Sequence, residues 1–331
     1  MKRRVLLLLL CTVLTVLPAA MNTGCSSGYT VTSAYDDAER YTAGNFTYRA
    51  DEVDHVSVNW YLGVVEVRES DTAVLKVSET AEGLSEAEQL HWYQDEDELY
   101  IEFCESGYYG RFENADKHLI LEVPKNVSLT VTNSSGVVML GEHTLKELDL
   151  KTASGNFSAG NLTAEKISIR SSGTVRLSDV QCTDAFSLKN QSGRVTVNSL
   201  SAEEMEAESF SGDIEIGSVQ TSHKTSISTE SGYVTLGEVR TSELEVETHS
   251  ANVKAALFVC TSVQVETLSG NVTLALKDNF GAVVDFHSTS GKLNAKQNAK
   301  LNRHDGEEEY VFASGQCRIN VTTTSGNLTV E

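Results

Sequence analysis

A Ser-Gly dipeptide recurs at nearly regular intervals from residue 135 onward. Up to residue 291 consecutive copies lie 18 to 21 residues apart, with Ser250-Ala251 in place of one copy. The turn glycines are Gly136, Gly155, Gly173, Gly193, Gly212, Gly232, Gly270, Gly291 and Gly326. A unit of this length cannot bury its apolar side alone, so stacked copies must share one core. The spacing predicts an all-β, repetitive β-solenoid with rungs of about 19 residues.

Apolar residues alternate with polar ones on both sides of each turn. Val195 and Val197 follow Gly193 by two and four residues, and Met205 and Ala207 precede the next turn glycine by seven and five. This period of two is typical of half-buried strands. Each rung is therefore predicted to run strand, Ser-Gly turn, strand, second turn. A third apolar position, seven residues after the turn position, marks the second corner: Leu162, Val180, Leu200, Val219, Val239 and Phe258.

The turn chemistry adds two expectations. Glycine reaches positive φ without a Cβ penalty, so the turn glycines are expected to adopt it. Ala251 then predicts a corner that is strained or differently shaped. The position two before the turn serine is mostly hydroxyl or amide, which favours structural hydrogen-bonded ladders along the axis over a ligand surface. Its members are Thr152, Asn190, Ser209, Thr229, Thr248, Thr267, Ser288 and Thr323.

The N-terminus predicts export. Three basic residues at positions 2–4 precede an apolar stretch at 5–17, which is too short for an ordinary transmembrane helix. The pattern is typical of a secretory signal, which we assign to residues 1–24.

The sequence Asn22-Thr23-Gly24-Cys25 resembles a bacterial lipobox. That resemblance implies lipidation of Cys25, with residues 25–40 as a tether. The expected location is the outer face of the cell membrane or the cell surface, where a multiply acylated anchor would hold the protein. The alternative is ordinary cleavage after Ala20, which leaves Cys25 as a free thiol.

Residues 41–132 lack the Ser-Gly repeat but still alternate, which predicts a less regular β-rich part before the solenoid at 133–331. An irregular stretch at 296–315 interrupts the solenoid and is interpreted as a cap, with a partner-contact loop as the alternative.

The order of the motifs resembles the bacterial adhesin-type β-strand-repeat family, also called the Toastrack domain family. The likeness rests on 56–60, on 63–67, on a strand ending at Pro124, and on turn copies such as 229–236. It covers about residues 50–331. The resemblance implies an envelope-exposed β-solenoid, linked in some members to envelope-stress systems and without established catalytic residues.

Charge and side-chain chemistry exclude several function classes. The net charge of −21 repels nucleic acid, so no nucleic-acid partner is expected. The histidines within the rungs share no rung position and are interpreted as surface residues. Asp213 stands alone after its turn and supplies too few oxygen ligands for calcium. We expect no metal, no cofactor and no catalytic residues.

Four cysteines remain for the folded body: Cys104, Cys182, Cys260 and Cys317. Cys182 and Cys260 share a rung position but lie four rungs apart, about 19 Å, which is beyond disulfide reach. Small buried hydrophobes are the expected role of these thiols.

These features favour a non-catalytic envelope lipoprotein that serves adhesin-like binding, scaffolding or envelope-stress sensing. Its expected partner is an envelope protein or a polysaccharide. One alternative is a carbohydrate-active β-helix enzyme, a lyase or hydrolase, which requires two carboxylates about 5–10 Å apart in a groove. The other alternative is a passive surface spacer.

Overall fold

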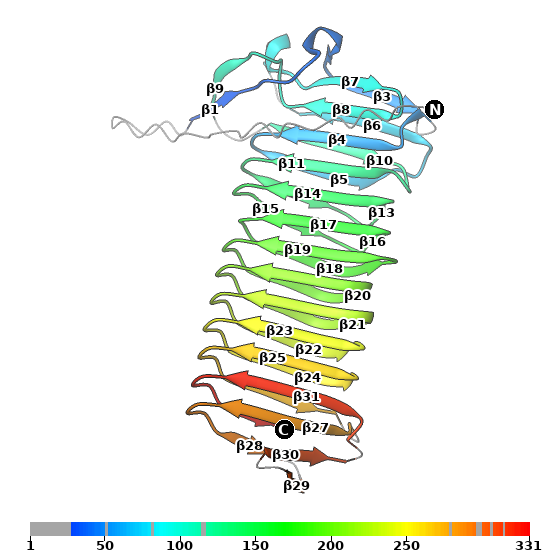
Figure 1. Ribbon diagram of the computed structural model, residues 1–331. Helices are drawn as coiled ribbons and strands as arrows, with labels where there is room; N and C mark the ends of the chain where they lie inside the picture. The colour runs from blue at the N-terminus through cyan, green and yellow to red at the C-terminus, as the bar shows by residue number, and fades with distance from the viewer. Residues whose placement is uncertain are drawn as a thin grey trace, which may run out of the picture.

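A computed structural model describes residues 28–49, 52–80, 83–113, 117–277, 280–295, 300–304, 307–313 and 315–331. In Figure 1 the chain forms a long stack of two-stranded rungs, with irregular strands at both ends. This confirms the predicted repetitive β-solenoid. None of the helices among the described residues has the length and hydropathy needed to cross a membrane.

Each rung contributes one strand to each of two faces. Face 1 holds the strands that precede the Ser-Gly turn, and face 2 holds those that follow it. Face 1 consists of β4 (His55–Trp60), β11 (Ser128–Asn133), β14 (Glu147–Thr152), β17 (Lys166–Ser171), β19 (Ala185–Asn190), the second halves of β20 (Val195–Ser209) and β21 (Ile214–Thr229), β23 (Glu243–Thr248), β25 (Ser262–Thr267), β31 (Cys317–Thr323) and β27 (Ala282–Ser288). Face 2 consists of β5 (Val64–Glu69), β12 (Val137–Leu140), β15 (Asn156–Ala159), β18 (Val175–Cys182), the first halves of β20 and β21, β22 (Val234–Arg240), β24 (Val253–Val259), β26 (Val272–Leu276), β32 (Leu328–Val330) and β28 (Leu293–Ala295).

Neighbouring rungs pair in parallel and in register, which stacks like positions on one another. Leu150 pairs with Ile169, which pairs with Leu188, and all three are buried. The alternation within each strand therefore becomes columns along the axis, which form the core between the two faces. The predicted strands and their inward positions agree with this arrangement.

The turn glycines stack in one column, but for a different reason than predicted. Of the turn glycines, Gly136 alone has φ in the left-handed region, at 129°. A Cβ on Gly212 would lie 2.0 Å from the carbonyl oxygen of Gly193, and one on Gly232 would lie 2.0 Å from that of Gly212. The expectation of positive φ was wrong for the column: at these glycines an added Cβ would meet the backbone of the neighbouring turn.

Ala251 is buried and has no left-handed φ, so its corner is not strained in that sense. Its rung is instead the one where the pairing of β22 with β24 shifts register beyond Leu236. The shift brings Leu257 opposite Val239 and buries it, whereas Phe258, predicted at this corner, is half-buried beside it.

The hydroxyl column stabilises the turns rather than forming the predicted ladders along the axis. The Ser209 hydroxyl donates to the Gly212 carbonyl (2.7 Å) and accepts from the Gly212 N–H (3.0 Å). One contact that does run between rungs is the bond from Thr152 Oγ1 to Ser171 Oγ (3.0 Å). Ser171 belongs to this column although it directly precedes its turn serine, because its turn is one residue shorter.

The last rung in the sequence is not the last rung in space. β31 pairs with β25 on one side and with β27 on the other, and β32 likewise lies between β26 and β28. The C-terminal rung at 317–330 is thus inserted between the two rungs that precede it in the sequence (Figure 1). β29 (Lys300–His304) and β30 (Glu307–Phe312) form an antiparallel pair, and β30 pairs with the outer edge of β27. Most of the stretch expected to be irregular, 296–315, is therefore this pair of strands.

Strands that pair mostly antiparallel with one another close the other end, which we call the N-terminal cap. Beyond β4 lie β8 (Glu98–Glu102), β7 (His91–Asp95) and β2 (Thr42–Ala43). Beyond β5 lie β10 (His118–Val123), β6 (Val74–Glu79) and β3 (Phe46–Arg49). The helical turns η1 (Ala38–Arg40) and η3 (Glu86–Glu88) also belong to the cap.

Two boundaries need correction. β1 (Gly28–Thr32) pairs with β9 (Tyr109–Glu113), so residues 28–32 are folded rather than part of a tether. The first regular parallel rung is β4 and β5, so the solenoid begins well before residue 133.

His143 corrects the interpretation of the histidines as surface residues. It follows Gly136 by seven residues, pairs with Leu162 through the short strands β13 (His143–Thr144) and β16 (Leu162–Ala164), and is 2% exposed. Among the residues that the structure describes, neither of its ring nitrogens has a hydrogen-bond partner. Burial lowers the pKa of His143 from 6.5 to about 4. It therefore occupies, as a neutral ring, a corner position that is aliphatic in the next rungs.

His143→Leu is expected to make the fold less sensitive to acid. Between pH 6.5 and about 4 the unfolded chain binds a proton on His143 that the folded chain does not, so stability falls as the pH falls through this window. The loss reaches a few kcal/mol by pH 4, at about 1.4 kcal/mol per pKa unit. Urea unfolding at pH 7 and pH 4.5 should show a smaller difference for His143→Leu than for the wild type. The exposed His223→Asn is the matched control, and an unchanged pH difference in both variants would contradict the prediction.

Candidate binding groove

A groove follows the edge of face 1, where the strands end and the Ser-Gly turns begin. Its main part has a volume of about 740 Å³ and extends along the axis from Thr132 to Glu230. A second hollow of about 670 Å³ occupies the same rung positions nearer the C-terminal end, between Glu247 and Thr324. We call the two together the turn groove. Because repeated rungs form the turn groove, its long axis runs across successive rungs. An elongated ligand therefore fits it better than a compact one.

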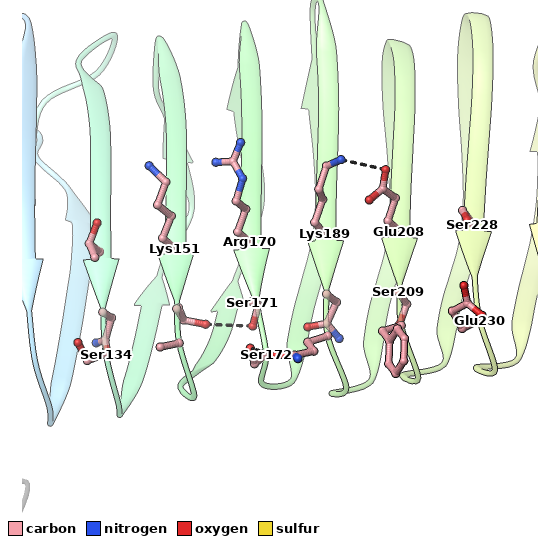
Figure 2. A pocket seen from close by; sticks show the side chains of 17 residues that line it. Ser134, Lys151, Arg170, Ser171, Ser172, Lys189, Glu208, Ser209, Ser228 and Glu230 are labelled. Atoms are coloured by element: carbon pink, nitrogen blue, oxygen red, sulfur yellow. Dashed lines mark hydrogen bonds and ion pairs between the residues drawn. The ribbon is translucent and has the colours of Figure 1, made fainter. Parts of the chain in front are cut away.

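Three basic side chains stand in consecutive rungs along the main part. Lys151 pairs in register with Arg170, and Arg170 with Lys189. We call these three residues the basic row. Their side chains lie along the strands and point in the same general direction (Figure 2), and they are 46%, 54% and 46% exposed. Neighbouring strands are about 4.8 Å apart, so the row presents cations at a nearly regular spacing.

The basic row is held by carboxylates beside it. Asp149 Oδ2 accepts from Lys151 Nζ at 2.8 Å, and its Oδ1 lies 3.4 Å from Arg170 Nη1. Lys189 Nζ donates to Glu208 Oε1 at 2.9 Å, as the dashed line in Figure 2 shows. Exposed pairs of this kind contribute only about 0.2–1 kcal/mol each, so an anionic ligand can exchange with these carboxylates at small cost.

The floor of the groove is polar and fixed. Thr152, Ser171 and Ser209 are nearly buried, and their hydroxyls are bonded to their own turns or to each other. At the rim, Phe210 is 64% exposed on its turn. An exposed aromatic ring beside polar groups offers a stacking surface with an apolar face.

The charge of the groove changes sign along the axis. The rung position of the basic row passes to Glu208 in β20 and to Ser228 in β21. Nearer the C-terminal end it is occupied by Glu247 and Glu266. The groove is thus basic in its N-terminal half and acidic in its C-terminal half.

Two carboxyl groups line the main part of the turn groove, and they stand on different rungs. Of the two that line the main part, Glu208 is ion-paired with Lys189, and Glu230 lies on the next turn. The carboxyl group whose pKa is raised to about 8 by burial is Glu102, which accepts a hydrogen bond from Asn59 in the N-terminal cap, outside the groove. Within the described ranges, no group of three or more His, Cys, Asp or Glu residues is arranged to hold a metal ion.

The structure places the residues that the sequence analysis singled out in different parts of the molecule. The turn glycines form one corner beside the groove, and Asp213 pairs with Arg194 at 3.0 Å. Cys25 lies outside the described residues.

The sequence analysis did not identify the basic row, although Lys151 and Lys189 each stand four residues before a turn glycine. Aligning the rungs by their glycines reveals these two but not Arg170, because its turn is one residue shorter.

Two solved structures and one family model are similar to this chain. A candidate cell adhesion protein from Clostridium sporogenes is similar at 12% identity, over 87% of this chain and 98% of that one, with a TM-score of 0.20. A candidate adhesin from Bacteroides fragilis is similar at 11% identity, over 87% and 96%, with a TM-score of 0.37. No curated protein matches the sequence. The family model described as Toastrack DUF4097 matches residues 53–259 and 221–331, which include the stacked rungs and the groove. The chain therefore belongs to the Toastrack DUF4097 family.

Proposed function

We propose that this protein is a non-catalytic, adhesin-like component of the cell envelope whose turn groove binds an extended anionic polysaccharide. The observation that carries the proposal is the basic row, three cations in consecutive rungs along an open, elongated groove. Lysine and arginine pair strongly with carboxylate, sulfate and phosphate groups. The exposed ring of Phe210 supplies a face on which a sugar ring can stack.

The net charge of −21 opposes an anionic ligand only at long range. At physiological ionic strength the Debye length is about 8 Å, so distant carboxylates are screened while cations in contact with the ligand are not. Recognition then depends on the local row. The acidic C-terminal half of the groove limits how far a polyanion extends along it, which favours a segment of a few sugar units over a whole chain.

Export and anchoring complete the proposed role. Residues 1–24 would direct the chain across the membrane, and acylation of Cys25 would hold it on the outer face. The N-terminal cap is the end of the rod nearest to Cys25 along the chain, so the groove would extend away from the membrane. Scaffolding and envelope-stress sensing are roles that a polymer-binding rod in this position would serve.

The triple variant Lys151→Gln, Arg170→Gln, Lys189→Gln is expected to lose binding. Three exposed ion pairs at about 0.5–1 kcal/mol each correspond to about ten- to hundredfold in affinity. Isothermal titration calorimetry with soluble polygalacturonate, alginate and hyaluronan, with neutral dextran as the comparison, measures the effect at 0.15 M salt. The wild type should bind at least one of the three polyanions and should not bind dextran.

The matched control changes three exposed basic residues outside the basic row: Arg176→Gln, Lys254→Gln and Lys292→Gln. It alters the net charge equally and should retain wild-type affinity. Equal losses in both triple variants would mean that net charge, not the groove, governs binding. Absence of binding to every polyanion would contradict the polysaccharide proposal and favour a protein partner.

A further inference from the structure

Two cysteines meet because the C-terminal rung is inserted out of sequence order. Cys260 lies two residues before β25, and Cys317 begins β31, the strand that pairs with β25. Ser262 is opposite Arg318, and the Arg318 N–H donates to the Thr261 carbonyl at 3.0 Å. The two cysteines therefore lie on directly neighbouring parallel rungs, at the same end of their strands.

Their thiols differ in exposure and acidity. Cys317 is 1% exposed, whereas Cys260 is half-buried, with its Sγ 3.0 Å from the Ser262 carbonyl oxygen. The interaction between the two thiols lowers the pKa of Cys260 and, together with burial, raises that of Cys317. The other two described cysteines are isolated, and burial raises the pKa of Cys104 to about 11 and that of Cys182 to about 12. Cys260 is thus the more exposed and more acidic thiol of the two, and Cys317 is its only neighbouring thiol among the described residues.

We propose that Cys260 and Cys317 are a disulfide-forming pair, and that their bond fastens the inserted C-terminal rung to the body of the solenoid. The oxidant is the disulfide of an exported thiol–disulfide oxidoreductase, or glutathione disulfide in vitro. The Cys260 thiolate attacks one sulfur of that disulfide and releases the other as a thiolate. Cys317 passes its proton to the released thiolate and attacks Cys260 Sγ, which expels the second thiol of the oxidant. Two protein thiols are oxidised and one disulfide of the oxidant is reduced.

The bond has a mechanical consequence at this end of the rod. The inserted rung separates the rung of β25 and β26 from that of β27 and β28. If the rung detaches, both of its neighbours expose a strand edge. A bond between its first residue and Cys260 also closes a long loop through residues 261–316, which restricts the unfolded chain strongly.

The test uses the purified full-length protein after treatment with glutathione disulfide or with dithiothreitol, so its result does not depend on export. Blocking of free thiols followed by peptide mass spectrometry should find Cys260 joined to Cys317 after oxidation, with Cys104 and Cys182 alkylated only after unfolding. The oxidised protein should have a Tm about 5–10 °C above that of the reduced protein, as expected for a loop of this length.

Cys260→Ser should abolish the Tm difference between oxidised and reduced samples, whereas Cys182→Ala should retain it. The mass spectrum of the wild type keeps the proposal testable even if a variant fails to fold. Recovery of both thiols in free form after oxidation overturns the proposal. So does a bond from Cys260 to any other thiol, whether in the same chain or in a second molecule.

Discussion

Gly212→Ala should lower the free energy of unfolding by more than about 3 kcal/mol, which is at the severe end for a single added methyl group. The added Cβ would lie 2.0 Å from the Gly193 carbonyl oxygen and 2.8 Å from the Gly193 carbonyl carbon. Both are backbone atoms, which cannot rotate away as a side chain does. Gly232 packs equally closely on the Gly212 carbonyl, so a shift of the turn at 212 disturbs the rungs on both sides.

Gly141→Ala is the matched control for this prediction. Its Cβ would meet its nearest neighbour, the Val67 carbonyl oxygen, at 3.9 Å, which is ordinary van der Waals contact. Because alanine also restricts the unfolded chain, the expected change is within about 1 kcal/mol of zero or slightly stabilising. Urea unfolding followed by far-ultraviolet circular dichroism measures both variants. Similar midpoints for the two would show that the close approach at the Ser-Gly corner does not limit the side chain.

Periodicity alone predicts most of the solenoid, because the signal for a strand and the signal for its buried face are the same alternation. The Ser-Gly spacing also locates the corners. It cannot say why glycine is there, since positive φ and close approach both demand the same residue. Ala251 illustrates the limit, because its φ is ordinary and the departure lies in the register of β22 and β24.

The spatial order of the last rungs cannot be inferred from the sequence. The 35-residue step from Gly291 to Gly326 is the same whichever edge β31 pairs with. Only the structure shows that β31 pairs with both β25 and β27. The neighbouring thiols of Cys260 and Cys317 follow from that order. Sequential stacking would have placed the rung of β27 between them.

The sequence also failed to reveal two buried polar side chains, His143 and Lys117. His143 stands at a corner position that is aliphatic in the following rungs. Because histidine is polar, the sequence pattern predicts that it is exposed at this position. Lys117 is a second case, since an isolated lysine next to a strand gives no sign of burial. Both lie where the pattern of the repeat is weakest, near the N-terminal cap.

Lys117 is the charged centre of that cap. Its side chain is 2% exposed, and its Nζ lies 3.0 Å from Oε2 of Glu79, itself 5% exposed. Nζ also donates to the carbonyl oxygens of Glu88, at 2.6 Å, and of Phe103, and it stands 4.1 Å from the centre of the Phe103 ring. Burial lowers the pKa of Lys117, an effect that the Glu79 carboxylate opposes. The pair therefore links η3, β6 and the segment after β8.

Lys117→Met should destabilise the cap by about 3–5 kcal/mol, the range found when one partner of a buried ion pair is removed. Methionine keeps much of the aliphatic stem, so the loss comes from the unpaired Glu79 carboxylate and the two carbonyl oxygens left without a donor. Both tryptophans of the chain, Trp60 and Trp92, lie in or next to the cap, so their fluorescence reports its unfolding. Urea titration should show a larger fall in the fluorescence midpoint than in the circular dichroism midpoint, which reports the whole solenoid.

A second substitution separates lost charge pairing from lost packing. Glu79→Gln removes the partner charge, and its amide oxygen can still accept the hydrogen bond from the Leu90 N–H, which Glu79 Oε1 accepts at 2.7 Å. If the cost of Lys117→Met is an uncompensated buried charge, the double variant should recover a large part of the stability. A double variant as unstable as Lys117→Met alone would assign the loss to the unpaired carbonyl groups and the aromatic contact. A Lys117→Met protein with the wild-type midpoint would mean that the ion pair does not hold the cap together.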